Sequence, residues 1–340
     1  MDIRQDKRSK DARGRQQPRL FHTRASMSAP ALWCMAPDQV QIRPGRMGDG
    51  LRVRTLFSGI SRGTERLVLA GRVPDSEYQR MRAPFQEGDF PFPVKYGYAA
   101  VGEVQEGELA GRAVFALHPH QTEFRLPAEA LIPLPRGLPP ERAVLAANME
   151  TALNILWDSG AGAGDRITVV GGGLVGLLVA FLAARLPGAE VTVVDPQPGR
   201  RAQAQVLGCG FCAPDAAPGD QDAVIHASAT QDGLVLALRI AGPQATVTEA
   251  SWHGTSSVAL PLGGAFHSRR LRIVSSQVGA LPPDRAARWT YRRRLTKALD
   301  LLADPGLDVL ISGETAFGDL PDAYPRILAD PDTLCHRIRY

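Results

Sequence analysis

One glycine-rich segment, residues 166–200, constrains the fold of this chain more than any other feature. A β-branched run over residues 167–170 ends in the sequence GGGLVG at 171–176, and a uniformly apolar stretch follows. A second β-branched run over residues 191–194 then ends at Asp195. This order predicts a strand, a tight turn, a helix and a second strand, which is the repeating unit of a doubly wound parallel sheet.

The turn matches the pattern G-x-G-x-x-G through Gly171, Gly173 and Gly176. The first glycine permits the sharp turn out of the strand, the second leaves out the Cβ that would block a pyrophosphate, and the third lets the helix lie close to the sheet. The helix would begin at Leu174 and Val175, where unpaired N–H groups and a partial positive charge favour phosphate groups. The pattern therefore predicts a dinucleotide site.

Asp195 lies 19 residues after Gly176, at the end of the second strand. A carboxylate at this place can accept hydrogen bonds from both hydroxyls of the adenosine ribose and would repel a 2′-phosphate, so we expect NAD rather than NADP. Arg200 and Arg201 follow closely and could soften this preference, or they could simply form a solvated helix start.

A membrane span is the alternative interpretation of the apolar stretch, because residues 167–186 contain one charge, Arg185. Three consecutive glycines are unfavourable inside a helix, and Pro187 and Gly188 end the stretch before an immediate strand. We therefore expect neither a membrane span nor a signal peptide, and we expect a cytoplasmic protein.

The composition suits two domains with a sizeable core, since the chain has 340 residues of which 44% are hydrophobic, and its four cysteines do not make a disulfide framework. The net charge of +4 comes from residues 1–26, which carry eight basic residues and three acids. This segment could be a nucleic-acid or membrane tail, or a disordered extension that precedes a start at Met27. We expect the extension, because the remainder carries a net charge of −1 and offers no basic surface for nucleic acid.

The residues before the glycine motif predict short strands, at 51–57, 95–104 and 112–117, with breaks rich in proline and glycine between them. They favour a small β-rich barrel, and residues 141–158 have the apolar spacing of a helix that leads into the motif. Strands continue to alternate with helices after the motif, as expected for a parallel sheet. These later strands are predicted at 222–226, 245–249 and 271–275.

Four short motifs together resemble the medium-chain dehydrogenase/reductase family: GISRGTE at 59–65, GYAAVGEV at 97–104, TAL at 151–153, and the glycine motif with Asp195. The resemblance implies an α/β protein with a GroES-like β-rich barrel domain and a Rossmann domain. It implies a discontinuous GroES-like domain from 28–150 and 286–340, a Rossmann domain from 151–285, and Thr151 at the cofactor. Residues 1–27 would lie outside both domains. A small-molecule substrate and a homodimer are the expected partners.

The metal ligands of the family's zinc-dependent members are absent from this sequence. Those members have a cysteine in GICGTD, where this chain has Ser61 or Arg62, and a histidine in Gly-His-Glu, where it has Tyr98. Their third ligand stands about four residues before the threonine of the inter-domain helix, where this chain has Ala147. Because a catalytic zinc needs three protein ligands, the resemblance implies a zinc-independent member.

Other residues offer weaker metal sites. His118, His120 and Glu150 could form a new site, but their spacing alone is a poor signal, since hydrogen-bonded histidines are commoner than ligands. Cys209 and Cys212 lack both a partner pair and the context of a helix start, so we interpret them as small apolar residues. We expect no metal.

The absence of zinc restricts the chemistry. Zinc lowers the pKa of bound water from far above the neutral range to about 7, which corresponds to about 12 kcal/mol, whereas one preorganised donor contributes about 3–4 kcal/mol. An activated alcohol or carbonyl is therefore the expected substrate. The motif GIS-x-GTE with the following Gly-Tyr is most similar to the branch that contains bacteriochlorophyllide hydroxyethyl dehydrogenase, although residues 78–95 and 118–124 depart from it. A quinone or enone reductase, and a non-catalytic dinucleotide sensor or scaffold, remain alternatives.

The proton-transfer group is predicted from the family alignment. Tyr98 and Thr64 stand near the positions that flank the metal in zinc-dependent relatives, so Tyr98 could donate to a developing alkoxide, exchange the proton if its pKa is lowered, and pass it to Thr64. Glu65 would brace the loop. Tyr98 could equally be a barrel core residue with a satisfied hydroxyl, and His118 is then the next candidate base.

Overall fold

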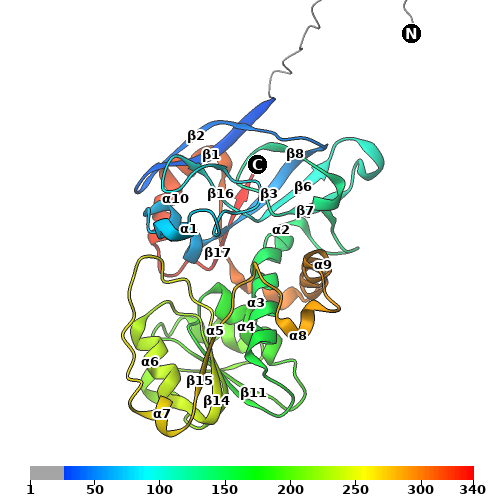
Figure 1. The fold of residues 1–340 in the computed structure, drawn as a ribbon. Helices are drawn as coiled ribbons and strands as arrows, with labels where there is room; N and C mark the ends of the chain where they lie inside the picture. The colour runs from blue at the N-terminus through cyan, green and yellow to red at the C-terminus, as the bar shows by residue number, and fades with distance from the viewer. Residues whose placement is uncertain (1–26) are drawn as a thin grey trace, which may run out of the picture.

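The computed structural model describes residues 27–340, so the basic segment 1–26 lies outside the described residues. Figure 1 shows two lobes: the strands at both ends of the described chain lie in the upper lobe, and the central part of the chain forms the lower lobe. Helix α3 (Ala146–Ser159) runs from the first lobe into the second.

The upper lobe contains two sheets. One has the order β2-β1-β5-β4, and the other has the order β16-β17-β3-β6-β7-β9 with β8 paired to β3. The C-terminal strand pairs antiparallel with β3, in a register that sets Cys335 opposite Ser61. The strands are β1 (Ser28–Ala36), β2 (Gln39–Arg46), β3 (Leu51–Ser61), β4 (Glu87–Gly88), β5 (Val94–Lys95), β6 (Ala100–Val104), β7 (Ala113–Ala116), β8 (Glu123–Leu126), β9 (Ile132–Pro133), β16 (Ile311–Ala316) and β17 (Cys335–Arg339).

The lower lobe is built on a six-stranded sheet with the order β12-β11-β10-β13-β14-β15. All of its neighbouring strands are parallel, as the alternation of strand and helix predicts. The strands are β10 (Arg166–Val170), β11 (Glu190–Val194), β12 (Gly210–Cys212), β13 (Gln221–His226), β14 (Ala241–Glu249) and β15 (Arg272–Ser275).

Helix α4 (Leu174–Ala183) explains the apolar stretch of the sequence. Nine of its ten residues are buried, because it packs between α3 and the parallel sheet rather than facing solvent on one side. No helix among residues 27–340 is long and apolar enough to cross a membrane. The remaining helices are α1 (Arg62–Leu69), α2 (Pro140–Ala143), α5 (Arg200–Val206), α6 (Gln231–Ile240), α7 (Ala265–Ser268), α8 (Pro283–Ala286), α9 (Tyr291–Leu301) and α10 (Leu320–Ala329).

Two predicted elements are each divided in the structure. The strand expected at 95–104 is broken between β5 and β6, where Gly97 has a φ of +115°, which lies outside the extended region of a strand. The helix expected at 141–158 is interrupted between α2 and α3, at Val144 and Leu145, both of which are fully buried.

Candidate active site

The carboxyl ends of the parallel strands meet at one edge of the sheet, and the strand register sets them level. Val170 of β10 pairs with Val194 of β11 on one side and with His226 of β13 on the other. His226 in turn pairs with Glu249 of β14. The glycine motif, Asp195 and the loops after β13 and β14 therefore lie along the edge where doubly wound sheets bind ligands.

The three motif glycines have different physical reasons to be glycine. Gly171 has a φ of +114°, and a Cβ there would lie 2.7 Å from the backbone nitrogen of Ser228. A Cβ on Gly176 would lie 1.9 Å from the carbonyl oxygen of Gly171. Gly173 is different, because no heavy atom lies within 4 Å of its Cβ position. The turn thus packs tightly against the protein at two glycines and leaves the third open, beside an α4 N-terminus that has no side-chain cap.

Asp195 is tied to the glycine turn by its carboxylate. One oxygen accepts a hydrogen bond from the backbone N–H of Gly172 at 2.7 Å, and the other accepts from the N–H of Gln197 at 2.8 Å. Each carboxylate oxygen keeps a second lone pair for another donor. The group is therefore fixed in position beside the turn and can still accept hydrogen bonds from a ligand.

The two arginines after Asp195 are committed to protein contacts. Arg200 is 6% exposed and donates to the carbonyl oxygens of Asp332 at 3.2 Å and Pro331 at 2.7 Å. Arg201 lies over the ring of Phe211, with 4.9 Å between its guanidinium carbon and the ring centroid, and it donates to the Phe211 carbonyl. The expectation of a solvated helix start is wrong for Arg200, because carbonyls from the distant C-terminal segment satisfy its guanidinium.

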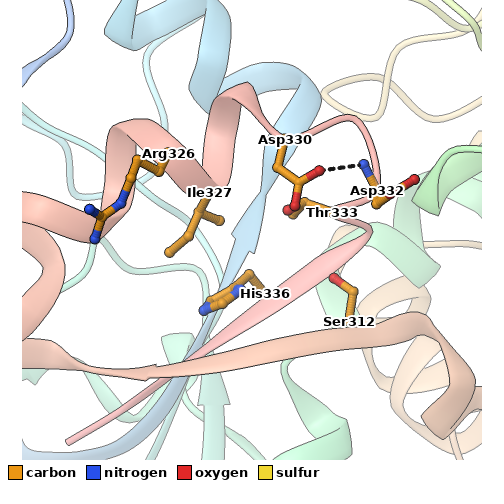
Figure 2. A pocket seen from close by; sticks show the side chains of 7 residues that line it. All are labelled: Ser312, Arg326, Ile327, Asp330, Asp332, Thr333 and His336. Atoms are coloured by element: carbon orange, nitrogen blue, oxygen red, sulfur yellow. Dashed lines mark hydrogen bonds between the residues drawn. The ribbon is translucent and has the colours of Figure 1, made fainter.

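A surface pocket lies next to these carbonyls, but it contains none of the predicted site residues. Figure 2 shows its lining from α10, from the turn after that helix and from the neighbouring strands β16 and β17. Within it, the N–H of Asp332 donates to Asp330 at 2.9 Å, and His336 pairs with Thr315 at 2.8 Å. We assign no reaction to it. Its lining residues are Ser312, Arg326, Ile327, Asp330, Asp332, Thr333 and His336.

Ser61 and Tyr98, which the sequence motifs align with zinc ligands of other dehydrogenases, lie near each other in the structure. Asn148 donates to the Ser61 hydroxyl at 3.0 Å, and Ser61 and Thr64 lie near the Tyr98 hydroxyl. Burial, with the negative charge of Glu65, raises the pKa of Tyr98 to about 12, although the nearby hydroxyls of Ser61 and Thr64 oppose the rise. A lowered Tyr98 pKa, the condition for proton exchange, is therefore not found. Tyr98 keeps its proton at neutral pH and can donate a hydrogen bond, but it is too weak an acid to release the proton readily.

Glu65 connects the loop that contains Ser61 to neighbouring segments of the upper lobe. It is fully buried, and it accepts hydrogen bonds from the Ser61 N–H at 2.7 Å and from the Tyr324 hydroxyl at 2.6 Å. It also contacts Nε2 of His120 at 3.0 Å, while Nδ1 of His120 pairs with Ser58 at 2.8 Å. The hydrogen bond from the Ser61 backbone fits the predicted role of Glu65 as a brace of the loop, and Tyr324 and His120 are further partners.

His118 and Thr151 have local partners. His118 is 2% exposed, stacks on Phe124 with 4.1 Å between ring centroids, and pairs through Nδ1 with the Pro119 carbonyl. Burial, with the nearby Lys95 charge, lowers the pKa of His118 to about 3, which makes it a poor proton acceptor at neutral pH. The Thr151 hydroxyl donates to the Ala147 carbonyl within α3.

Glu150 pairs with a different residue from those expected in a metal site. It forms a buried ion pair with Arg294, with 3.0 Å between Nε and Oε1. Arg294 is itself 2% exposed and also contacts Asn154 and the Val278 carbonyl. Cys209 is a buried free thiol and Cys212 a half-buried one, which agrees with the prediction of small apolar residues.

Another polar cluster, which the sequence did not predict, lies at the ends of β13 and β14. His226 contacts Glu249 through Nδ1 at 2.7 Å and Ser228 through Nε2 at 2.6 Å, and His253 lies 3.5 Å from the same Glu249 oxygen. Within residues 27–340, His226, Glu249 and His253 form the one group of at least three potential metal ligands. Two ligands of a tetrahedral zinc at about 2.0–2.1 Å are separated by about 3.3 Å, so the 2.7 Å contact fits a hydrogen bond better.

Comparisons with known proteins agree with this architecture, although no family model matches the chain. D-guloside 3-dehydrogenase of Escherichia coli K12 is 24% identical over 311 residues, which cover 82% of this chain and 89% of that protein. A solved structure described as a zinc-binding dehydrogenase from Sinorhizobium meliloti 1021, bound to NADP, superposes with a TM-score of 0.72 at 19% identity. The superposition covers 92% of this chain and all of that one.

A second solved structure, described as a short chain alcohol dehydrogenase from Escherichia coli CFT073 complexed with NADH, has a TM-score of 0.74 at 16% identity, covering 92% of this chain and 99% of that one. This chain has the two-domain fold of these dehydrogenases. The predicted fold class, a GroES-like barrel domain with a Rossmann domain, is confirmed. No comparison tests the individual site residues.

Proposed function

We propose that the protein is an NAD-dependent oxidoreductase that moves a hydride between nicotinamide and a secondary alcohol or its ketone. The observation that carries this proposal is the glycine turn, which is packed against protein at Gly171 and Gly176 and open at Gly173. A pyrophosphate needs that open position next to a helix N-terminus. The names of the curated relative and of the solved neighbours, all dehydrogenases, support the same activity.

The preference for NAD rests on the surroundings of Asp195. Its carboxylate is fixed by two backbone N–H groups and would repel the 2′-phosphate of NADP. A nearby cation would favour that phosphate, but the buried Arg200 donates to two carbonyl oxygens, which leaves the exposed Arg201, stacked on Phe211, as the cation to consider. The bound NADP of one structural neighbour makes this preference a point to be tested directly.

Nicotinamide supplies a carbon that accepts or donates hydride, and the protein must hold the substrate and provide for transfer of the hydroxyl proton. We assign hydrogen-bond donation to the substrate oxygen to Tyr98, whose high pKa keeps the hydroxyl protonated. Ser61 and Thr64 lie beside that hydroxyl, and Asn148 holds the Ser61 hydroxyl by a hydrogen bond. The arrangement is zinc-independent in this proposal, since Ser61 or Arg62, Tyr98 and Ala147 stand in the sequence where the motifs of zinc-dependent dehydrogenases have their ligands.

The substrate class follows from the weakness of hydrogen bonds relative to zinc. One donor stabilises an alkoxide by about 3–4 kcal/mol, so the substrate hydroxyl must carry electron-withdrawing neighbours. A sugar hydroxyl meets this condition and agrees with the name of the guloside dehydrogenase relative. A hydroxyl next to a conjugated ring also meets it and agrees with the motif likeness to the bacteriochlorophyllide branch. We place glycosides first, because that relative aligns with 82% of the chain.

The test is a titration of the purified protein with NADH and NADPH, followed by a turnover screen. We expect NADH to bind at least about tenfold more tightly than NADPH. The screen then offers NAD with glycosides, polyols and aryl carbinols, and NADH with quinones and enones. Failure to bind either nucleotide would refute the proposal. Turnover of the quinones and enones alone would make the protein a reductase, and binding without any turnover would make it a sensor.

A further inference from the structure

The cluster around His226 is a continuous hydrogen-bonded network that joins the loops after β13 and β14. A neutral His226 satisfies both of its contacts, because Nδ1–H donates to Glu249 while Nε2 accepts from the Ser228 hydroxyl. The Ser251 N–H donates to the second Glu249 oxygen at 2.6 Å, and the Ala229 N–H donates to the Ser251 hydroxyl at 3.0 Å. The network therefore fixes the Glu249 carboxylate in place at the ends of β13 and β14.

The sheet order indicates which part of a dinucleotide meets this carboxylate. β11, with Asp195 after it, lies on one side of β10, and β13 and β14 lie on the other. If Asp195 holds the adenosine ribose and the glycine turn holds the pyrophosphate, the second half of the dinucleotide extends over the ends of β13 and β14. This step rests on the proposed function. It places the Glu249 carboxylate on the nicotinamide side of the site.

Glu249 is also close to the place where the two lobes meet. Trp252 packs against the core of the upper lobe, and a Cβ on Gly254 would lie 2.6 Å from the carbonyl oxygen of Arg72, which follows α1. The Glu249 side chain is 15% exposed, so it is partly shielded from water without being sealed off. A charge in such a place acts on a neighbouring ligand more strongly than it would in bulk solvent.

We propose that Glu249 selects the oxidised form of the bound nicotinamide. The oxidised ring carries a positive charge and the reduced ring is neutral, so a fixed carboxylate on this side of the site stabilises the first and not the second. His226 and Ser251 are positioning residues that hold the carboxylate. The same preference moves the equilibrium between bound cofactor forms towards NAD⁺, which favours reduction of a ketone over oxidation of an alcohol.

The experiment measures the dissociation constants of NAD⁺ and NADH, in the presence of EDTA, for the wild type and for Glu249→Gln. We expect the variant to bind NAD⁺ about tenfold more weakly and NADH within about twofold of the wild type. Glu190→Gln is the matched control, since it removes the same charge from an exposed residue at the opposite end of β11. We expect it to change neither constant.

A second variant and a cofactor fragment keep the result interpretable. ADP, which lacks nicotinamide, should bind Glu249→Gln as it binds the wild type, which shows that the variant is folded. If Glu249→Gln does not fold, His253→Lys takes its place, because the lysine adds a positive charge beside the same Glu249 oxygen from a side chain that is 18% exposed. We expect the ratio of the Kd for NAD⁺ to the Kd for NADH to rise at least about threefold in this variant.

An unchanged ratio in the folded variant, or an equal change in Glu190→Gln, overturns the proposal while the proposed function stands. A wild type that binds neither nucleotide overturns both.

Discussion

Gly173 and Gly176 are both part of the glycine motif, but the structure predicts opposite consequences for replacing them with alanine. At Gly173 the backbone φ is −73° and the Cβ would point into open space. Alanine there restricts the unfolded chain, which stabilises by about 0.4–1 kcal/mol, and it is a poorer helix N-cap than glycine, which costs about the same amount. We expect the stability of Gly173→Ala to stay within about 1 kcal/mol of the wild type.

Although its stability should change little, Gly173→Ala should bind dinucleotide more weakly than the wild type. The added methyl group of Gly173→Ala lies where the proposed pyrophosphate approaches the α4 N-terminus, so we expect the Kd for NADH to rise at least about tenfold, or about 1.4 kcal/mol. In Gly176→Ala the Cβ would lie 1.9 Å from the Gly171 carbonyl oxygen, a backbone atom that cannot rotate away. We expect a loss of at least about 3 kcal/mol of stability, which the helix propensity of alanine, about 1 kcal/mol, does not offset.

Thermal unfolding and NADH titration of the two variants, side by side, check this reasoning. The expected pattern is an unchanged melting temperature with weak binding for Gly173→Ala, and a melting temperature lowered by several degrees for Gly176→Ala. Wild-type NADH affinity in Gly173→Ala would refute the assignment of the open position to the pyrophosphate. Wild-type stability in Gly176→Ala would refute the close helix–turn contact.

Three further predictions concern side chains outside the turn. Tyr98→Phe removes the proposed donor and should lower kcat about a hundredfold with NADH binding intact, and a change below about threefold would remove Tyr98 from the mechanism. Because the folded-state pKa of His118, about 3, lies below the unfolded value of about 6.5, the unfolded state binds a proton that the folded state does not. The free energy of unfolding should therefore fall by about 1.4 kcal/mol for each pH unit between about 6.5 and 3. His118→Asn removes this titration, so in chemical denaturation it should lose less stability between pH about 7 and pH about 5 than the wild type does. Arg294→Met leaves Glu150 buried without its partner and should cost about 3–5 kcal/mol in chemical denaturation, whereas the double change to Met and Gln should recover much of that loss.

The dinucleotide motif could be found from the sequence because its parts are local. Residues 166–195 form a single strand–turn–helix–strand unit, and the reasons for each residue type act over short distances along the chain. The cluster of His226 and Glu249 has no such signal, because the two residues are 23 positions apart and meet only through the register of β13 and β14.

Burial explains the other differences between the prediction and the structure. The sequence shows a tyrosine at 98 and a histidine at 118, but only the packing reveals that both pKa values move away from neutrality. Arg200 similarly looks like a solvated residue until the C-terminal segment places two carbonyl oxygens against it. Properties that depend on contacts between distant segments were therefore the ones that sequence reasoning missed or reversed.

The most direct test of the proposed zinc-independent mechanism is the rate of NAD-dependent turnover as a function of zinc content per chain. Protein purified without chelator, protein treated with EDTA and protein loaded with zinc would be compared on one substrate from the screen, with zinc measured by elemental analysis. The account predicts the same rate per chain in all three samples. A rate that falls with the loss of zinc and returns in proportion to added zinc would contradict it.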